Sequence, residues 1–192
     1  MALAFARRIA LLVFALLALP TGAQAENPIL APAPFDAPPE GTRLVLEDLI
    51  NGGTASGKVT ALDGYILGWT SQGQTAKSVT HFCPDCLQAG IGADGGPLAQ
   101  LYPLEVGKGI TFTRSRGDLT WHDEILVVGT DSITTPAGSF DTFVVRRRSK
   151  TPDDSWRAEQ RNWYAPALGW VVKFEAFTTD GRRQSWQLVS VD

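Results

Sequence analysis

Short apolar runs separated by turn residues dominate the sequence from Thr42 to the C-terminus. Runs rich in Val, Ile, Thr, Phe and Trp alternate with Gly, Asp and Pro, and the repeat of apolar residues every three to four positions that marks a helix is almost absent. Asp63-Gly64 and Asp180-Gly181 are dipeptides that favour two-residue hairpin turns. We therefore predict a mainly β protein with little helix, built as a strongly twisted antiparallel sheet that wraps a core.

The expected strands follow from these runs, and one segment between them has a different composition. The predicted strands span residues 43–49, 57–62, 64–71, 74–83, 109–116, 119–129, 140–150, 156–164, 169–178 and 184–191. Residues 87–102, LQAGIGADGGPLAQLY, are rich in glycine and predict a loop with one helical turn near Leu98. No internal repeat is evident.

The N-terminal residues predict export. Arg7 and Arg8 precede an apolar run of eleven residues, 9–19, and Ala23-Gln24-Ala25 has the small-x-small pattern of a cleavage site. A helix of that length spans only about 16 Å, which is short for a bilayer core of roughly 30 Å. We predict a signal peptide over 1–25 rather than a retained membrane anchor. Without a Cys at the cleavage site, we expect no lipid attachment and no stable membrane span after cleavage, and we predict a periplasmic protein.

The remaining chain is expected to form one domain behind a linker. Residues 26–41 contain five prolines and predict an extended, Pro-rich linker, so the β-rich domain is expected to span 42–192. Loss of Arg7 and Arg8 with the leader takes the net charge from −3 to −5. Because nucleic-acid binders usually carry a strong excess of Lys and Arg, we expect no nucleic-acid partner.

Four stretches in the second half of the chain resemble a known family. They read LYPLEVGKGITFT (101–113), VGTDSITTPAGSFDTFVVRRR (128–148), NWYAPALGWVVKFE (162–175) and WQLVSV (186–191). In this order they are similar to the exported bacterial proteins of the DUF3108 type and their TapB-like relatives. The resemblance implies a fold, a single curved antiparallel sheet forming an incompletely closed barrel or sandwich, and it implies no activity. Ile110 or Phe112 stands near the family's Trp, and Asp131 stands near its common Glu.

The stretch HFCPDC, residues 81–86, falls outside that resemblance and holds both cysteines of the chain. A thioredoxin-like thiol needs a helix after the motif, whereas glycines follow Cys83-Pro84-Asp85-Cys86 almost at once. Asp85 would also raise rather than lower the pKa of a neighbouring thiol. Since two close cysteines in an exported protein usually oxidise, we predict a structural disulfide between Cys83 and Cys86, with thiol–disulfide exchange as an alternative.

A zinc site is the other alternative for this stretch. His81, Cys83 and Cys86 provide three potential ligands, and His122, the second histidine of the chain, would complete a tetrahedral set. Residues 81 and 83 point to the same side of a strand, which suits joint coordination. His122 lies about forty residues away in sequence, and no local pattern brings it close. Apart from this alternative, we expect no cofactor.

Three further motifs have structural interpretations that we favour. Gly90-Ile91-Gly92-Ala93-Asp94-Gly95 matches G-x-G-x-x-G, but no long helix is expected after it, so a loop is predicted rather than a dinucleotide site. His122 and Glu124 share one face of a strand and could serve acid–base chemistry, yet no nucleophile accompanies them. A possible anion contact consists of Arg146, Arg148, Arg157 and Arg161. We expect acidic neighbours to pair with these arginines on an exposed surface.

The sequence therefore predicts an exported, non-catalytic binding protein. The abundance of Trp and Phe on an open-edged sheet predicts an apolar groove for an apolar or amphipathic small ligand, or for a partner protein of the cell envelope. The alternative is a thiol–disulfide or zinc-binding protein that uses HFCPDC.

Overall fold

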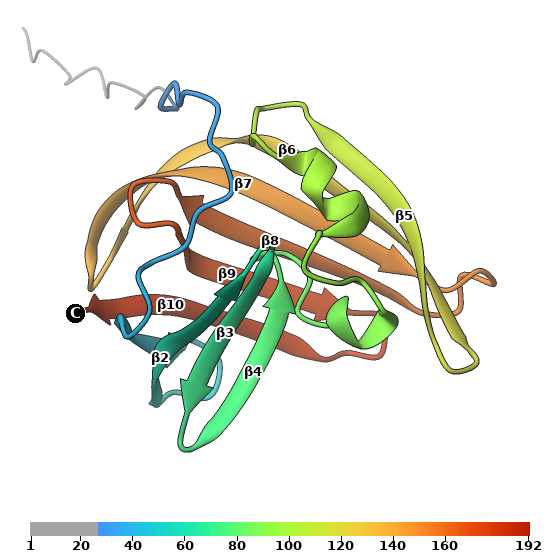
Figure 1. Cartoon of the computed structure of the whole chain (residues 1–192), viewed down its shortest axis with the longest axis horizontal. Coiled ribbons are helices and arrows are strands. Elements are labelled where there is room, and N and C mark those ends of the chain that lie inside the picture. Colours follow the sequence, from blue (N-terminus) through green and yellow to red (C-terminus); the bar gives the residue numbers. More distant parts are fainter. Residues whose placement is uncertain (1–26) are drawn as a thin grey trace, which may run out of the picture.

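The computed structural model describes residues 27–192 and shows a mainly β protein (Figure 1). Its ten strands are β1 (Arg43–Asp48), β2 (Thr54–Asp63), β3 (Ile66–Ser71), β4 (Gln74–Val79), β5 (Gly109–Arg116), β6 (Leu119–Thr135), β7 (Gly138–Lys150), β8 (Arg157–Ala165), β9 (Trp170–Thr178) and β10 (Arg183–Val191). Two short 3₁₀ turns, η1 (Leu87–Ala89) and η2 (Gly96–Leu101), lie between β4 and β5. The predicted fold class is confirmed. The predicted signal peptide, 1–25, lies outside the described residues.

All ten strands belong to one antiparallel sheet that does not close. Their order is β4-β3-β2-β1-β10-β9-β8-β7-β6-β5, so β4 and β5 are its two edges. The paired strands follow one another in sequence except for β1 and β10, which pair with Leu44 opposite Val191 and Asp48 opposite Trp186. This pairing joins a four-stranded and a six-stranded meander. Figure 1 shows β2–β4 turning across β8–β10, which gives the sheet its curvature.

The β6–β7 hairpin is longer than its sequence pattern predicts. Its ladder of paired residues continues from the His122–Lys150 pair to the Thr135–Gly138 pair, past the interrupted apolar alternation of residues 130–135. The turn at Pro136-Ala137 closes the hairpin, where proline provides the fixed φ that suits a tight turn. Backbone pairing therefore continues through residues where the apolar alternation has already stopped, and both strands are longer than that alternation predicts.

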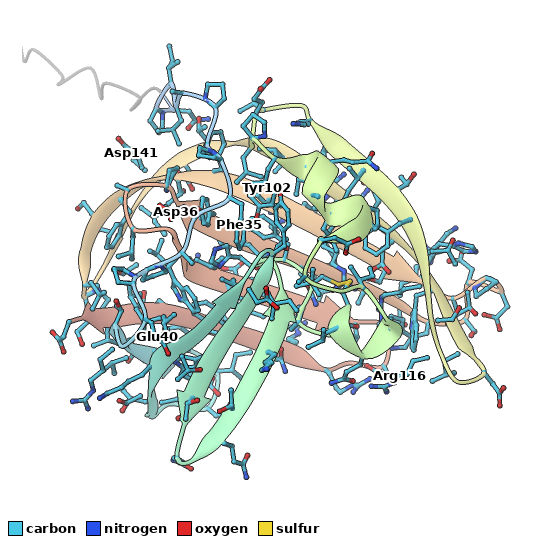
Figure 2. The ribbon with its side chains drawn as sticks, viewed as in Figure 1. Phe35, Asp36, Glu40, Tyr102, Arg116 and Asp141 are labelled. Carbon is cyan, nitrogen blue, oxygen red and sulfur yellow. A yellow bond between two sulfur atoms is a disulfide. The ribbon has the colours of Figure 1, made fainter. Side chains whose placement is uncertain are left out.

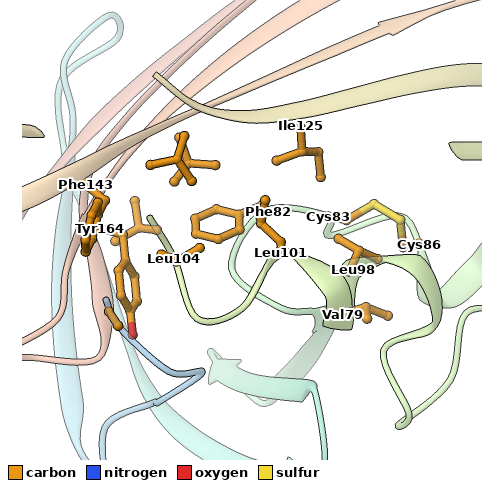
Figure 3. Packing of buried hydrophobic residues seen from close by; sticks show 14 residues of the cluster. Val79, Phe82, Cys83, Cys86, Leu98, Leu101, Leu104, Ile125, Phe143 and Tyr164 are labelled. Carbon is orange, nitrogen blue, oxygen red and sulfur yellow. A yellow bond between two sulfur atoms is a disulfide. The ribbon is translucent and has the colours of Figure 1, made fainter. Parts of the chain in front are cut away.

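The connection between the two edge strands fills the gap that keeps the sheet open. We call residues 80–108 the inter-edge segment. Its buried side chains pack against the concave side of the sheet, where they meet Val79, Ile125, Phe143 and Tyr164 (Figure 3). The fully buried apolar residues of the segment are Phe82, Cys83, Cys86, Leu98, Leu101 and Leu104. The glycine-rich stretch thus belongs to the core, and its predicted helical turn near Leu98 is η2.

The described part of the predicted linker is extended and lies against the domain. Ala33 forms a backbone bridge with Leu104, with hydrogen bonds in both directions. Phe35 packs against Tyr65 and Tyr102, at ring-centroid distances of 4.9 and 5.4 Å, and Figure 2 shows it beside Tyr102. The prolines account for the extended path, since they fix φ and cannot donate to a helix. Burial of apolar side chains between them attaches this segment to the fold.

The described residues include no helix that is long and apolar enough to cross a membrane.

Candidate functional site: an aromatic groove beside the cysteine turn

A groove of about 450 Å³ lies between the β3–β4 hairpin and the β9–β10 part of the sheet. We call it the aromatic groove. Three tryptophans line it, and His81 and Pro84 of the HFCPDC stretch contribute to its wall. The complete lining is Leu46, Leu67, Gly68, Trp69, Thr75, Ala76, Lys77, Ser78, His81, Pro84, Gln88, Trp170, Val171 and Trp186. No carboxylate is among these residues.

Packing in the sheet fixes each tryptophan. Trp69 on β3 lies so close to Gly57 on β2 that a Cβ at Gly57 would come within 2.3 Å of its Nε1 and Cε2. Trp186 on β10 stacks on Phe174 of β9, with ring centroids 5.5 Å apart. Trp170 at the start of β9 meets the ring of His81 edge-on at 5.3 Å. The indole N–H groups of Trp69 and Trp170 are buried without a hydrogen-bond partner among the described residues. The groove is therefore walled by rings that the fold holds in place.

His81 connects the aromatic groove to the N-terminal segment. Its Nε2 lies 2.9 Å from the backbone oxygen of Asp36, and Tyr164 donates its hydroxyl to the same oxygen at 3.3 Å. The imidazole also packs against the rings of Phe35 and Tyr164, at 5.9 and 5.0 Å. Burial lowers the pKa of His81 to about 4, against the opposing influence of Asp36. The ring is therefore neutral at physiological pH.

A group of four charged residues, of which all but Asp85 are buried, anchors the cysteine turn. Asp123 on β6 accepts hydrogen bonds from Arg114 on β5 at 2.7 Å and from Arg147 on β7 at 2.9 Å. Both arginines also reach Asp85, with Arg114 Nη1 at 2.7 Å and Arg147 Nη1 at 2.9 Å. Ser149 Oγ donates to Asp123 as well. Two cations and two anions thus compensate one another where an isolated buried charge would be costly.

Asp85 is ionised in this arrangement. Burial would raise the pKa of its carboxyl, but the charge and hydrogen bond of Arg147 and the charge of Arg114 outweigh that effect, and the pKa is lowered. Arg114 is further held by Trp121, because its guanidinium carbon lies 4.3 Å from the centre of that ring. The turn that carries His81 and Pro84 into the aromatic groove is therefore fastened to two strands, β5 and β7, through the carboxylate of Asp85.

The cysteines lie side by side within the core. The Sγ atoms of Cys83 and Cys86 are at disulfide distance, with their Cα atoms 5.3 Å apart, and both residues are fully buried. Thiol–disulfide exchange requires an attacking thiolate to reach a sulfur atom. η1, the turn after Cys86, is only three residues long, so it provides no helix dipole comparable to that of a redox motif. This arrangement suits a structural bond and disfavours exchange chemistry.

The four predicted zinc ligands do not come together. Among residues 27–192, the group of three or more potential ligand atoms within 4.8 Å of one another is Cys83, Asp85 and Cys86, and neither histidine belongs to it. His122 lies on β6, where its Nδ1 is 3.1 Å from Thr113 Oγ1. Asp85 is already held by two arginines.

The four arginines of the predicted anion contact each pair with a carboxylate. Arg146 binds Glu124 at 3.0 Å, Arg148 and Arg161 both bind Glu159, and Arg157 binds Asp154. Arg148 and Arg157 line a second hollow of about 920 Å³, the outer hollow, together with His122, Glu124 and Phe177. Its lining has four acidic and three basic side chains, so charge gives it no preference for anions. The expected acidic partners of these arginines are therefore present.

The G-x-G-x-x-G stretch has no nucleotide-binding context in the described part of the chain. Gly90 ends η1 and Gly95 begins η2, both with positive φ, and η2 spans only six residues. No long helix follows to present its N-terminus to a pyrophosphate. The stretch instead links two short turns of the inter-edge segment.

Sequence reasoning missed the buried charged group, although the strand alternation contains a signal for it. Asp123 is two residues from Ile125, and Arg147 is two residues from Val145, so each lies on the buried face of its strand. Charged residues at inward positions of neighbouring strands indicate mutual pairing. Asp85 carries no such signal, because its position depends on the path of the inter-edge segment.

Comparison with known proteins supports the predicted resemblance. A family model described as DUF3108-like matches residues 124–189, which extend from β6 to β10. Three of the four landmarks lie wholly or mostly within this range, whereas residues 101–113 lie outside it. The suspected family resemblance is thus confirmed for the C-terminal part of the chain. No curated protein matches the chain.

Solved structures with similar folds come from several bacteria. The lipoprotein YmcC of Escherichia coli K12 gives a TM-score of 0.48 at 9% identity, covering 85% of this chain and 90% of that protein. A protein of Parabacteroides distasonis described as a lipoprotein gives 0.46 at 16% identity, covering 85% and 100%. A protein of Bacteroides fragilis described as exported, with a YmcC-like fold, gives 0.44 at 16% identity, covering 83% and 99%.

Proposed function

We propose that this chain is an exported, non-catalytic protein that binds a small apolar or amphipathic molecule in the aromatic groove. The observation that carries the proposal is the groove itself, with its three tryptophans and no carboxylate in the lining. Its volume of about 450 Å³ lies within the range of roughly 300–1,000 Å³ that is usual for small-molecule sites. Aromatic side chains provide large apolar contact areas in such sites.

The construction of the groove also supports a binding role. Trp69, Trp170 and Trp186 come from three different strands, and the ion pairs of Asp85 with two buried arginines fix the turn that closes one side. A rigid wall reduces the entropy that a ligand must lose on binding. The predicted leader and the predicted oxidation of Cys83 and Cys86 both suit a protein that works in the periplasm.

A fluorescence titration with N-phenyl-1-naphthylamine, an uncharged aromatic probe, tests this proposal. We expect saturable binding with one site per chain. Ala76, exposed on β4 directly opposite Trp69, allows the groove to be filled without disturbing the core. Ala76→Trp should therefore weaken probe binding by roughly tenfold or more.

Phe177→Ala is the matched control, because Phe177 is an exposed aromatic residue that lines the outer hollow. This variant should bind the probe as the wild type does. The proposal is wrong if the wild type shows no saturable binding, or if Ala76→Trp binds as tightly as the wild type.

A further inference from the structure

The hydrogen bond between His81 and Asp36 determines which ring nitrogen of His81 carries a proton. A backbone carbonyl oxygen can only accept, so Nε2, which lies 2.9 Å from Asp36 O, must donate. In a neutral imidazole the other nitrogen, Nδ1, is then an acceptor without a hydrogen. Nδ1 has no hydrogen-bond partner within residues 27–192. The rings of Phe35, Tyr164 and Trp170 hold the imidazole in this orientation.

Three hydroxyl or amide side chains of the lining have partners within the fold, whereas the indole N–H groups of Trp69 and Trp170 are donors without one. Ser78 Oγ donates to the backbone oxygen of Thr80, Thr75 Oγ1 pairs with Thr70 Oγ1, and Gln88 Oε1 accepts from Arg116. Nδ1 of His81, a groove-lining residue, is a side-chain acceptor that makes no hydrogen bond within residues 27–192 and is not among the fully buried polar atoms there. An acceptor in an apolar wall favours ligands that donate a hydrogen bond, since an apolar group placed against it would leave it unsatisfied.

We propose that the aromatic groove selects apolar molecules that carry a hydroxyl group, and that His81 Nδ1 accepts the hydrogen bond from this hydroxyl. This inference rests on the proposed function, because it names the ligand class for the same groove. The apolar body of the ligand lies against Trp69, Trp170 and Trp186, while its hydroxyl reaches His81. His81 is a specificity-determining residue in this arrangement and takes part in no chemical step.

Two probes of nearly the same shape test the inference: 2-naphthol, which donates a hydrogen bond, and 2-methoxynaphthalene, which does not. Isothermal titration calorimetry at pH 7 should show that 2-naphthol binds the wild type roughly five- to tenfold more tightly, the effect of one hydrogen bond. In His81→Phe we expect this ratio to fall to about one. A purely structural role of His81 would weaken both probes equally and leave the ratio unchanged.

A measurement on the wild-type protein covers the case in which His81→Phe does not fold. Two-dimensional ¹H–¹⁵N spectra of the imidazole should show the proton on Nε2, and the Nδ1 resonance should shift on saturation with 2-naphthol but not with 2-methoxynaphthalene. Equal affinity of the two probes for the wild type, or an unchanged Nδ1 resonance, overturns the selectivity while leaving the groove as a binding site. Failure of both probes to bind removes the proposed function as well.

Discussion

Arg147 on β7 donates through Nη1 to Asp85 Oδ1 at 2.9 Å, and this contact joins the concave side of the sheet to the turn between the two cysteines. The same guanidinium binds Asp123, so one side chain holds both the buried carboxylate of Asp123 and the partly exposed carboxylate of Asp85. Neither Asp85 nor Arg147 lines the aromatic groove. The position of His81 and Pro84 in its wall therefore depends on an ion pair outside the groove.

Removal of Arg147 should strongly destabilise the protein. Arg147→Met leaves Asp123 and Asp85 with Arg114 alone, and breaking a buried ion pair in this way costs about 3–5 kcal/mol. Urea unfolding followed by circular dichroism measures the loss. Arg148→Met is the matched control, because Arg148 is the next residue, is exposed, and pairs with Glu159. The control should lose less than about 1 kcal/mol. Equal losses in the two variants would contradict the anchoring role of Arg147.

Stability should fall as the pH is lowered from about 6.5 to about 4, and His81 should account for part of the fall. Burial lowers the pKa of folded His81 to about 4, below the value of about 6.5 in an unfolded chain. Between these values the unfolded chain binds a proton that the folded chain does not. The contribution of His81 is therefore complete above pH 6.5 and is lost as the pH falls, by up to about 1.4 kcal/mol per pH unit.

Unfolding free energies at several pH values, compared between the wild type and His81→Phe, isolate this contribution. The variant should show a shallower dependence between pH 6.5 and 4 than the wild type. His122→Phe controls for the loss of a histidine, since His122 lies exposed on β6. Parallel curves for the wild type and His81→Phe would show that His81 is not held neutral by the fold.

Loss of the bond between Cys83 and Cys86 should have a moderate cost. The bond closes a loop with a sequence separation of only three, for which chain entropy predicts a stabilisation of about 2 kcal/mol. The double variant Cys83→Ala/Cys86→Ala should lower the free energy of unfolding by that amount and still fold, because the ion pairs of Asp85 also hold the turn. Since both cysteines are buried, we expect no catalysis of insulin reduction. Insulin reduction by the wild type, absent in the double variant, would favour thiol–disulfide exchange.

Zinc binding is the alternative that the geometry favours least, and it has a direct test. Protein prepared anaerobically with reduced cysteines should contain well below one zinc per chain by elemental analysis. His122 contacts Thr113, away from the cysteines, and Asp85 is engaged by Arg114 and Arg147. Equimolar zinc that disappears in His81→Ala would instead support a metal site.

Gly57→Ala should displace Trp69 and so disturb the wall of the aromatic groove. The added Cβ would come within 2.3 Å of the Trp69 ring and 2.7 Å of the backbone oxygen of Thr70, so Trp69 must move. We expect a destabilisation of about 1–3 kcal/mol and weaker binding of N-phenyl-1-naphthylamine. Gly129→Ala on β6 is the control, because nothing lies within 4 Å of its added Cβ. A Gly57→Ala protein that matches this control in stability and binding would show that Trp69 is not packed against Gly57.

Sequence patterns within single strands were sufficient to predict most of the sheet. The bounds of β5, Gly109–Arg116, agree with the expected strand. Asp180-Gly181 lies between β9 and β10, and Gly64 lies in the turn after Asp63, the last residue of β2. Alternation and turn chemistry are local properties, so they can be read without knowledge of distant residues. The β6–β7 hairpin exceeded its prediction because pairing with a neighbouring strand stabilises residues that lack an apolar pattern.

The sequence by itself determined that this protein is a mainly β chain, and that its two cysteines are close enough in sequence to bond. Only the tertiary structure decided what lies around them. The aromatic groove requires the β1–β10 pairing, which brings Trp69 and Trp186 to opposite walls, and the buried charged group requires Asp85 to reach strands that follow it by tens of residues. Such contacts depend on how the sheet curves and where the inter-edge segment enters it. These are properties of the packed chain, whereas periodicity describes only neighbours along one strand.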